Sequence, residues 1–200
     1  MPVQPLPYRR EGDHFLIEMH LGQLRQLFNT LDPSPFRERD LDRSAEHYLI
    51  SAAEELPGHV AFKIRLYLPA DALGSAAAAQ VPDAIHHYFS WQASEAERRL
   101  RAHLRAARTA LALGGLFLAL CLAFSALVGS RLAGLVADFL REGALVLGWV
   151  ALWRPLDMFL YEWRPLHREV RNLRRIATAA VELRPAPVET HGAPGSGPAV

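Results

Sequence analysis

The stretch from Thr109 to Ser130 reads TALALGGLFLALCLAFSALVGS and contains no charged residue. A helix rises by about 1.5 Å per residue, so these 22 residues suffice to cross the roughly 30 Å hydrocarbon core of a bilayer. The sequence therefore predicts a transmembrane helix over residues 109–130. Every other part of the chain has to be placed relative to this segment.

A second apolar region follows, but it is harder to delimit. Gly143 to Trp153 is uncharged and has only 11 residues, which is too short to cross a bilayer alone. Apolar character continues on the other side of Arg154 and Asp157. We therefore expect a return span over residues 142–161, so that the two spans form a transmembrane hairpin.

That span places Arg154 and Asp157 at the edge of the bilayer, three residues apart on one helix face. Ionisable residues at membrane depth are candidate functional residues. The alternative interpretation is an arginine that reaches toward the headgroups and is neutralised by its neighbour. Pro155 removes a helix hydrogen bond beside the pair and predicts a kink.

Charge is distributed unevenly along the chain. Residues 1–97 contain 8 basic and 14 acidic residues, whereas basic residues crowd the segments on either side of the two spans. The positive-inside rule places both of these basic collars, and with them the N- and C-termini, in the cytoplasm. An arginine near anionic headgroups contributes about 1 kcal/mol, so a bilayer with anionic lipids is one expected partner. An acidic domain disfavours nucleic acid as a partner. The candidate membrane-surface residues are Arg98, Arg99, Arg101, Arg105 and Arg108 in the first collar, and Arg164, Arg168, Arg171, Arg174 and Arg175 in the second.

Small residues recur every four positions in both spans. Gly115, Ala119 and Ala123 do so in the first span, and Ala144 and Gly148 in the second. Such stripes allow close helix packing. Contact within the hairpin and contact between protomers both remain open, and a homodimer is one expectation.

The N-terminal part predicts a small α+β domain of β-α-α-β order over residues 1–81. Alternation of apolar and polar residues predicts strands at 15–21 and 60–68. Helices are expected at 23–31 and 42–56, separated by the turn-rich DPSPF at 32–36. A crossover of this kind makes the two strands parallel. Because two strands are marginal in water, support must come from a third strand at 8–13, from the long helix, or from a second copy of the chain.

The remaining segments complete the predicted architecture. A long helix beginning after Pro82 leads into the membrane, so that residues 82–161 hold this helix and the hairpin. Residues 162–184 predict a basic amphipathic helix with Pro165 at its first position. Proline and glycine dominate residues 185–200 and predict a disordered tail.

No motif of known chemistry is present. The nine histidines include no helical pair with an accompanying acid of the kind that binds zinc, and Cys121 lies within the first apolar segment. Phosphate-binding, nucleophile-elbow and CxxC motifs are also absent. We therefore expect no enzyme, and no catalytic, cofactor-binding or metal-binding residue.

Three stretches carry a resemblance to a known group of proteins: DPSPF at 32–36, AIHHYF at 84–89 and GWVALWRPLDMFLYEW at 148–163. Together they resemble a family of uncharacterised small bacterial inner-membrane proteins with two transmembrane helices. The likeness covers roughly residues 15–183. It implies a multi-pass protein of the bacterial cytoplasmic membrane and supplies no activity or ligand.

Two functions remain open at this point. The first is a non-enzymatic adaptor or regulatory module, anchored by the hairpin, that presents its cytoplasmic domain to a protein partner. The alternative is an oligomeric transport-related or lipid-handling protein in which Arg154 and Asp157 contact an anionic solute or headgroup. Two spans do not enclose a path in a monomer, so the alternative requires self-association.

Overall fold

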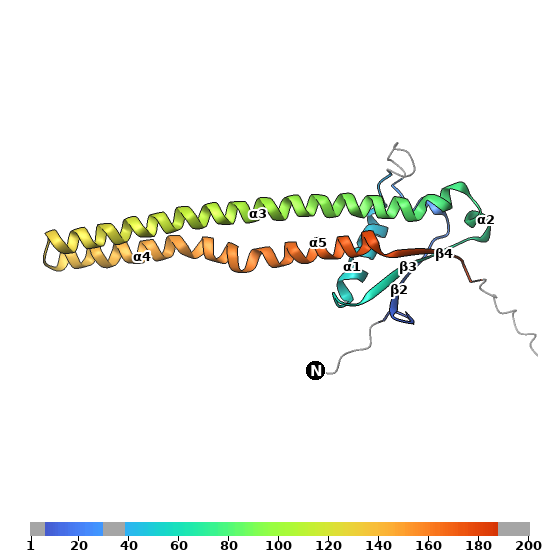
Figure 1. Cartoon of the computed structure of the whole chain (residues 1–200), viewed down its shortest axis with the longest axis horizontal. Helices are drawn as coiled ribbons and strands as arrows, with labels where there is room; N and C mark the ends of the chain where they lie inside the picture. The colour runs from blue at the N-terminus through green and yellow to red at the C-terminus, as the bar shows by residue number, and fades with distance from the viewer. Residues whose placement is uncertain (1–6, 30–38, 188–200) are drawn as a thin grey trace, which may run out of the picture. The chain divides into compact units, whose positions relative to one another are not determined.

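The computed structural model describes residues 7–29 and 39–187, which divide into two compact units. The first unit combines the chain up to Ser90 with the chain from Arg174 onward, and the second is Trp91–Leu173. Figure 1 colours the chain from its N-terminus to its C-terminus and labels most of its helices and strands. The chain is of mixed α+β class, as predicted, with a long helix and a C-terminal helix. The DPSPF turn and most of the predicted tail lie outside the described residues.

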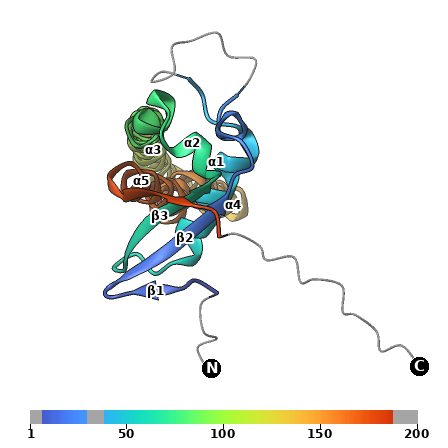
Figure 2. The ribbon, with the colours of Figure 1, turned by 90° about the vertical axis from the view of Figure 1, so that its right-hand side faces the viewer.

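A four-stranded sheet forms the centre of the first unit. Its strands lie side by side in the order β1 (Arg10–Glu11), β2 (His14–His20), β3 (Ala61–Leu68) and β4 (Ala180–Pro185) (Figure 2). β2 and β3 confirm the two predicted strands and are parallel. β1 pairs antiparallel to β2, so the 8–13 segment does add a strand.

β4 corrects the prediction of one helix over residues 162–184. Helix α5 (Trp163–Thr178) ends first, and the chain continues as a strand parallel to β3. Val181 is four residues from Ala177 and so fits the helical spacing of the preceding segment. Its backbone nevertheless pairs beside Ile64, more than a hundred residues earlier, and this contact is invisible to local periodicity.

The two faces of the sheet have different character. Register aligns Ile17 with Ile64 on one face, and both are fully buried. On the other face β2, β3 and β4 align Glu18, Arg65 and Glu182 in one row. The apolar face and the buried side chains of the helices form the core. These are Ala45, Leu49, Ala52 and Ala53 of α1 (Arg43–Glu55) and Ala78, Val81, Ala84, Ile85 and Phe89 of α3 (Ala76–Arg131).

The two short predicted helices fare differently. α1 lies within the expected 42–56, and Asp42 is its N-cap, with a side-chain oxygen that accepts from the Ser44 amide at 2.8 Å. Of the helix predicted over residues 23–31 the structure describes residues 23–29, and these contain only a 3-10 turn, η1 (Leu24–Leu27). Leu27 is fully buried there, so a single turn suffices to bury the apolar residue that suggested a helix. A second short helix, α2 (Ala70–Leu73), follows β3.

The long helix begins earlier than predicted. α3 starts at Ala76, and Ser75 Oγ accepts a hydrogen bond from the Ala78 amide at 3.1 Å. Pro82 lies inside the helix rather than before it. Proline there forgoes the bond to the Ala78 carbonyl, but Ala78 and Val81 are fully buried, and this burial holds the extra turn in place.

The second unit consists of helices. After α3 the chain turns at Gly134, whose φ of +108° favours glycine, and returns as α4 (Leu135–Asp157). Five π-helical residues, η2 (Met158–Glu162), connect α4 to α5. α4 starts before the predicted limit of 142, because residues 135–141 form its first turns. Among the helices of the described residues, α3 alone is long and apolar enough to cross a membrane.

Candidate functional site

α3 and α4, called the two arms of the second unit below, pack antiparallel. Adding a Cβ atom to Gly148 of α4 would place it 2.7 Å from Leu118 and 3.2 Å from the Cβ of Cys121 on α3. Further along, a Cβ on Gly114 would lie 3.3 Å from Pro155. The predicted small-residue stripe of the second span, Ala144 and Gly148, is therefore a packing face within the hairpin.

The first-span stripe does not take part in this packing. Ala119 and Ala123 are exposed, and no atom lies within 4 Å of a Cβ added to Gly115. α3 instead turns toward the returning chain of α4, η2 and α5 a row spaced alternately by three and four residues, the spacing of helices that pack along their lengths. The buried or half-buried members of this row are Leu100, Leu104, Ala107, Leu111, Gly114, Leu118, Cys121, Ser125 and Val128.

Beyond this row the apolar segments face outward. In the most apolar 18-residue stretch of α3 only 17% is buried, and Leu120 is 60% exposed. On α4, Leu135 is 87% and Trp153 76% exposed. The core helix of a soluble protein would be mostly buried, so these helices present a continuous apolar surface of the kind that marks a membrane or protein contact.

The predicted polar pair is present, and it belongs to a larger cluster. Arg154 lies 3.4 Å from Asp157 and 2.8 Å from Glu162, which the sequence analysis did not single out. Glu162 in turn lies 3.7 Å from Nε2 of His103 on α3. That nitrogen is buried and has no hydrogen-bond partner within the described part of the chain. Arg154, Asp157, Glu162 and His103 are called the polar cluster below.

The backbone explains why Glu162 comes within reach. Pro155 lacks an N–H, and the helix changes to π geometry from Met158, a change that often accompanies functional sites. Helical side chains usually lean toward the N-terminus, but Arg154 reaches eight residues onward to Glu162, toward the second basic collar. This direction is the one that the solvation interpretation of Arg154 expects.

The ten candidate surface arginines fall into three groups. Two of them pair with a carboxylate: Arg98 with Glu95 at 2.6 Å and Arg99 with Glu169 at 3.6 Å. Six are exposed, and within residues 7–29 and 39–187 no carboxylate lies within 4.0 Å of them. These six, called the arginine ring below, are Arg101, Arg105, Arg108, Arg164, Arg168 and Arg171. Arg174 and Arg175 belong to the first unit.

Arg175 has a structural role rather than the predicted surface role. Its Nη1 donates to the carbonyls of Ala53 and Leu56, and its Nη2 to those of Pro57 and Val60, at 2.8 to 3.5 Å. These carbonyls belong to the C-terminal end of α1, where cations are favoured, and to the loop that leads from it to β3. The guanidinium also lies 5.0 Å from the ring centroid of Phe62. The sequence offered no signal for this, since Arg175 resembles its neighbours in the collar.

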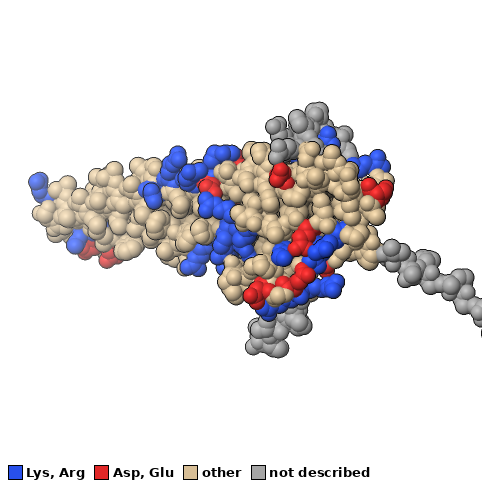
Figure 3. Space-filling view, turned by 45° about the vertical axis from the view of Figure 1, so that its right-hand side comes forward, with Lys and Arg blue, Asp and Glu red and all other residues tan. Residues whose placement is uncertain are grey.

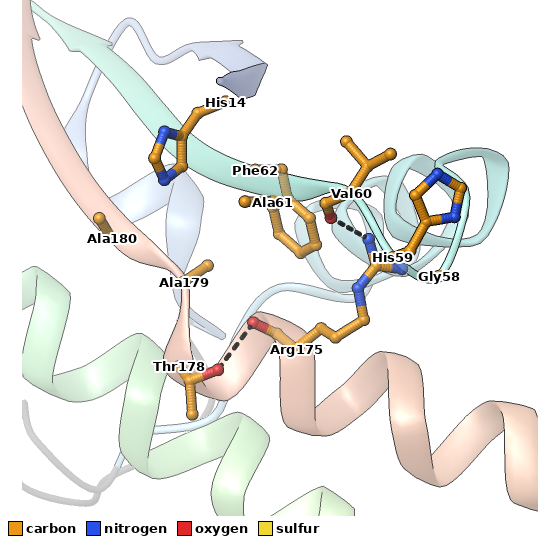
Figure 4. A pocket seen from close by; sticks show the side chains of 10 residues that line it. All are labelled: His14, Gly58, His59, Val60, Ala61, Phe62, Arg175, Thr178, Ala179 and Ala180. Carbon is orange, nitrogen blue, oxygen red and sulfur yellow. Dashed lines mark hydrogen bonds between the residues drawn. The ribbon is translucent and has the colours of Figure 1, made fainter. Parts of the chain in front are cut away.

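Arg175 also forms one wall of a cavity of about 440 Å³ in the first unit. His14 and His59 lie on opposite sides of it, and Phe62 lies between them (Figure 4). The ten lining residues include no carboxylate. Because Nη1 and Nη2 of Arg175 donate to backbone carbonyls, these groups are already engaged and do not point to a ligand in the cavity.

The polar face of the sheet holds an ion-pair network that sequence reasoning missed. Arg65 bonds to Glu11 and to Glu182, the latter at 2.8 Å, and Lys63 reaches Glu182 at 3.1 Å. Hydrogen bonds from Arg65 and then from Lys63 lower the pKa of Glu182. The Glu182 hydrogen bond also raises the pKa of Arg65. The alternation of apolar and polar residues in β3 predicts that Lys63 and Arg65 share a face. Their common partner, Glu182, lies on β4, which the sequence did not predict as a strand.

In the described part of the chain, no group of three or more His, Cys, Asp or Glu side chains is arranged to hold a metal ion. Comparisons with protein-family models, with curated proteins and with solved structures find no match to this chain.

Proposed function

We propose that this chain is an integral protein of the bacterial inner membrane whose helical hairpin crosses the bilayer twice. The observation that carries the proposal is the outward apolar surface of both arms. In α3 the large side chains from Leu113 to Leu127 are mostly exposed, and α4 continues the pattern to Trp153. A bilayer removes this surface from water, whereas an isolated hairpin would leave it exposed.

The first unit then serves as a cytoplasmic adaptor or regulatory module without catalytic activity, tethered by the hairpin. Support comes from its polar sheet face, where the exposed side chains of Glu11 and Arg184 flank the largely buried pair of Arg65 and Glu182. Such a surface gives specificity to a protein contact through charge complementarity. The likeness to small two-span membrane proteins described above agrees with this proposal.

Fusions of a reporter that is active only outside the cytoplasm test the topology. We expect activity for a fusion after Val136, in the first turn of α4 next to the connection with α3, and silence for fusions after Leu68 and Leu183. Activity at Leu183 would mean that α4 does not return and would overturn the hairpin. Activity at Leu68 would place the first unit outside and overturn the adaptor.

The polar cluster favours a second candidate function, an oligomeric transport-related or lipid-handling protein. Its test is a charge exchange. If Arg154 and Asp157 only solvate each other, Asp157→Ala lowers the protein level, and exchanging the two residues largely restores it. Restored level without restored phenotype of the gene deletion supports the functional role. Normal level and normal phenotype for both single alanine variants remove the pair from consideration.

A further inference from the structure

The arginine ring gathers at one level of the second unit. Arg99 of α3 meets Glu169 of α5, and His103 meets Glu162 a little further on, so residues 98–108 and 162–171 run alongside each other. Figure 3 shows blue side chains grouped where an almost entirely tan stretch of the helices begins. The ring therefore combines positions that lie more than fifty residues apart in the sequence.

In the described part of the chain, no carboxylate pairs with the arginines of the ring. Glu95, Glu97, Glu162 and Glu169 are the acids at this level, and three of them, Glu95, Glu162 and Glu169, pair with Arg98, Arg154 and Arg99. The six ring arginines are all exposed, and in the part of the chain that the structure describes none has a carboxylate within 4.0 Å. Six adjacent cations without counter-ions generate a strong positive potential.

The side chains next to the arginine ring indicate which kind of anion the ring binds. Immediately beyond Arg108 the exposed side chains become apolar, with Leu113 at 62% exposure. On the other arm the ring adjoins the exposed aromatic side chains of Trp153 and Tyr161. Along the hairpin, apolar side chains are followed by aromatic ones and then by arginines. A phospholipid offers matching layers, because its acyl chains suit the apolar side chains, its interfacial region the aromatic ones and its phosphate the arginines. A nucleic acid would match the arginines only.

We infer that the arginine ring is a binding surface for the phosphate groups of anionic phospholipids, which it concentrates around the hairpin. This inference rests on the proposed function, since it requires the hairpin to lie in a bilayer. Guanidinium groups suit the task because they donate paired hydrogen bonds to phosphate oxygens. The surface recognises headgroup charge and leaves the acyl chains unspecified.

The test uses the full chain in nanodiscs made of phosphatidylcholine and phosphatidylglycerol. Brominated acyl chains quench nearby tryptophans, and Trp149, Trp153 and Trp163 lie on the hairpin. The bromine is carried in one preparation by the anionic lipid and in the other by an equal mole fraction of the zwitterionic lipid. We expect at least about two-fold more quenching by the anionic lipid at low salt, and a smaller difference at high salt.

Matched variants assign the effect to the ring. Arg105→Gln with Arg168→Gln should reduce the preference, and glutamine at all six ring positions should abolish it. Arg25→Gln with Arg43→Gln removes the same charge from exposed positions of the first unit and should leave the preference intact. A preference that survives the six-fold variant, or that falls equally in the control, overturns the inference.

The outcomes separate this inference from the proposed function. Equal quenching by both brominated lipids leaves the hairpin in the bilayer and overturns the lipid selectivity. No quenching by either lipid overturns the membrane placement, and the inference falls with it. If a short RNA binds the wild-type discs but not the six-fold variant, while quenching is equal, the ring binds nucleic acid and the lipid assignment is wrong.

Discussion

Residues of one type perform different tasks in this protein according to their tertiary surroundings. Arg171 and Arg175 lie four positions apart on α5 and carry the same charge. Arg171 is exposed and belongs to the arginine ring, whereas Arg175 is half-buried and donates to the carbonyls at the end of α1. A count of basic residues treats them as equivalent, so only the contacts of each side chain assign its role.

Replacing Arg175 should therefore destabilise the first unit. Arg175→Ala leaves several carbonyls at the end of α1 without a charged donor and removes the contact with Phe62. We expect a loss of about 2 kcal/mol or more in the free energy of unfolding, measured by circular dichroism of the solubilised protein. Arg171→Ala is the control and should change stability by less than about 0.5 kcal/mol. Equal effects would show that Arg175 is a surface residue after all.

Glu182 should make the stability of the first unit depend on pH. Its pKa is lowered from the ordinary value of 4.5 by hydrogen bonds from Arg65 and then Lys63. Because the folded-state pKa lies below the unfolded-state one, the stabilisation is complete above about pH 4.5 and is lost as the pH falls through the folded-state pKa. We expect stability to decline more steeply below about pH 4.5 in the wild type than in Glu182→Gln. Parallel declines, measured as thermal midpoints across this range, would contradict this origin.

At the scale of elements, the packing of α3 against α4 depends on small residues at the contact. Gly148 lies where any larger side chain meets Leu118 and Cys121, whereas Gly143 of the same helix has no atom within 4 Å of an added Cβ. Two glycines that look alike in the sequence therefore differ in what they allow. In a span, where lipid tails are as apolar as leucine, this closeness supplies the attraction between helices.

A disulfide tests this contact directly. An added Cβ at Gly148 lies 3.2 Å from the Cβ of Cys121, near the separation that disulfides require. Under mild oxidation Gly148→Cys should form an intramolecular bond with Cys121, seen as a shift in gel mobility after cleavage in the turn between the arms. Gly143→Cys should remain reduced. Cross-linking of Gly143→Cys alone would place the arms in a different register.

For the whole molecule, self-association decides whether the transport alternative survives. Ala119 and Ala123 are exposed and do not pack against α4, so they leave a small-residue face open to a helix from outside the hairpin, such as that of a second copy. Ile64, in contrast, is fully buried in the first unit.

We therefore expect a homodimer that Ala119→Leu weakens, measured as the mass of the protein in lipid nanodiscs. Ile64→Asp should unfold the first unit rather than separate the copies, because it buries a charge without a partner. A wild-type protein found only as a monomer would remove the dimer, and with it a path formed by two helices from each copy.

Much of the architecture could be predicted because it depends on residues that are close together in the sequence. The apolar run from Thr109 to Ser130, the alternation in β2 and β3, the Asp42 cap and the spacing of Arg154 and Asp157 each depend on residues within a few positions of one another. The predictions that failed depend on distant residues. The proline at position 82 predicts a helix that starts after it, whereas α3 includes Pro82 because Ala78 and Val81 are buried by residues distant in the sequence.

The sequence by itself determined that this chain carries a long apolar helix, a parallel strand pair and two basic segments beside the apolar regions. Only the tertiary structure decided that residues 180–185 form a fourth strand, that Glu162 joins Arg154, and that Arg175 leaves the surface set while six other arginines share one level. The physical reason is the distance along the sequence over which each interaction acts. Periodicity and capping act over one or two turns of chain, whereas strand pairing, helix contacts and ion pairs join groups whose sequence separation carries no signal of their proximity.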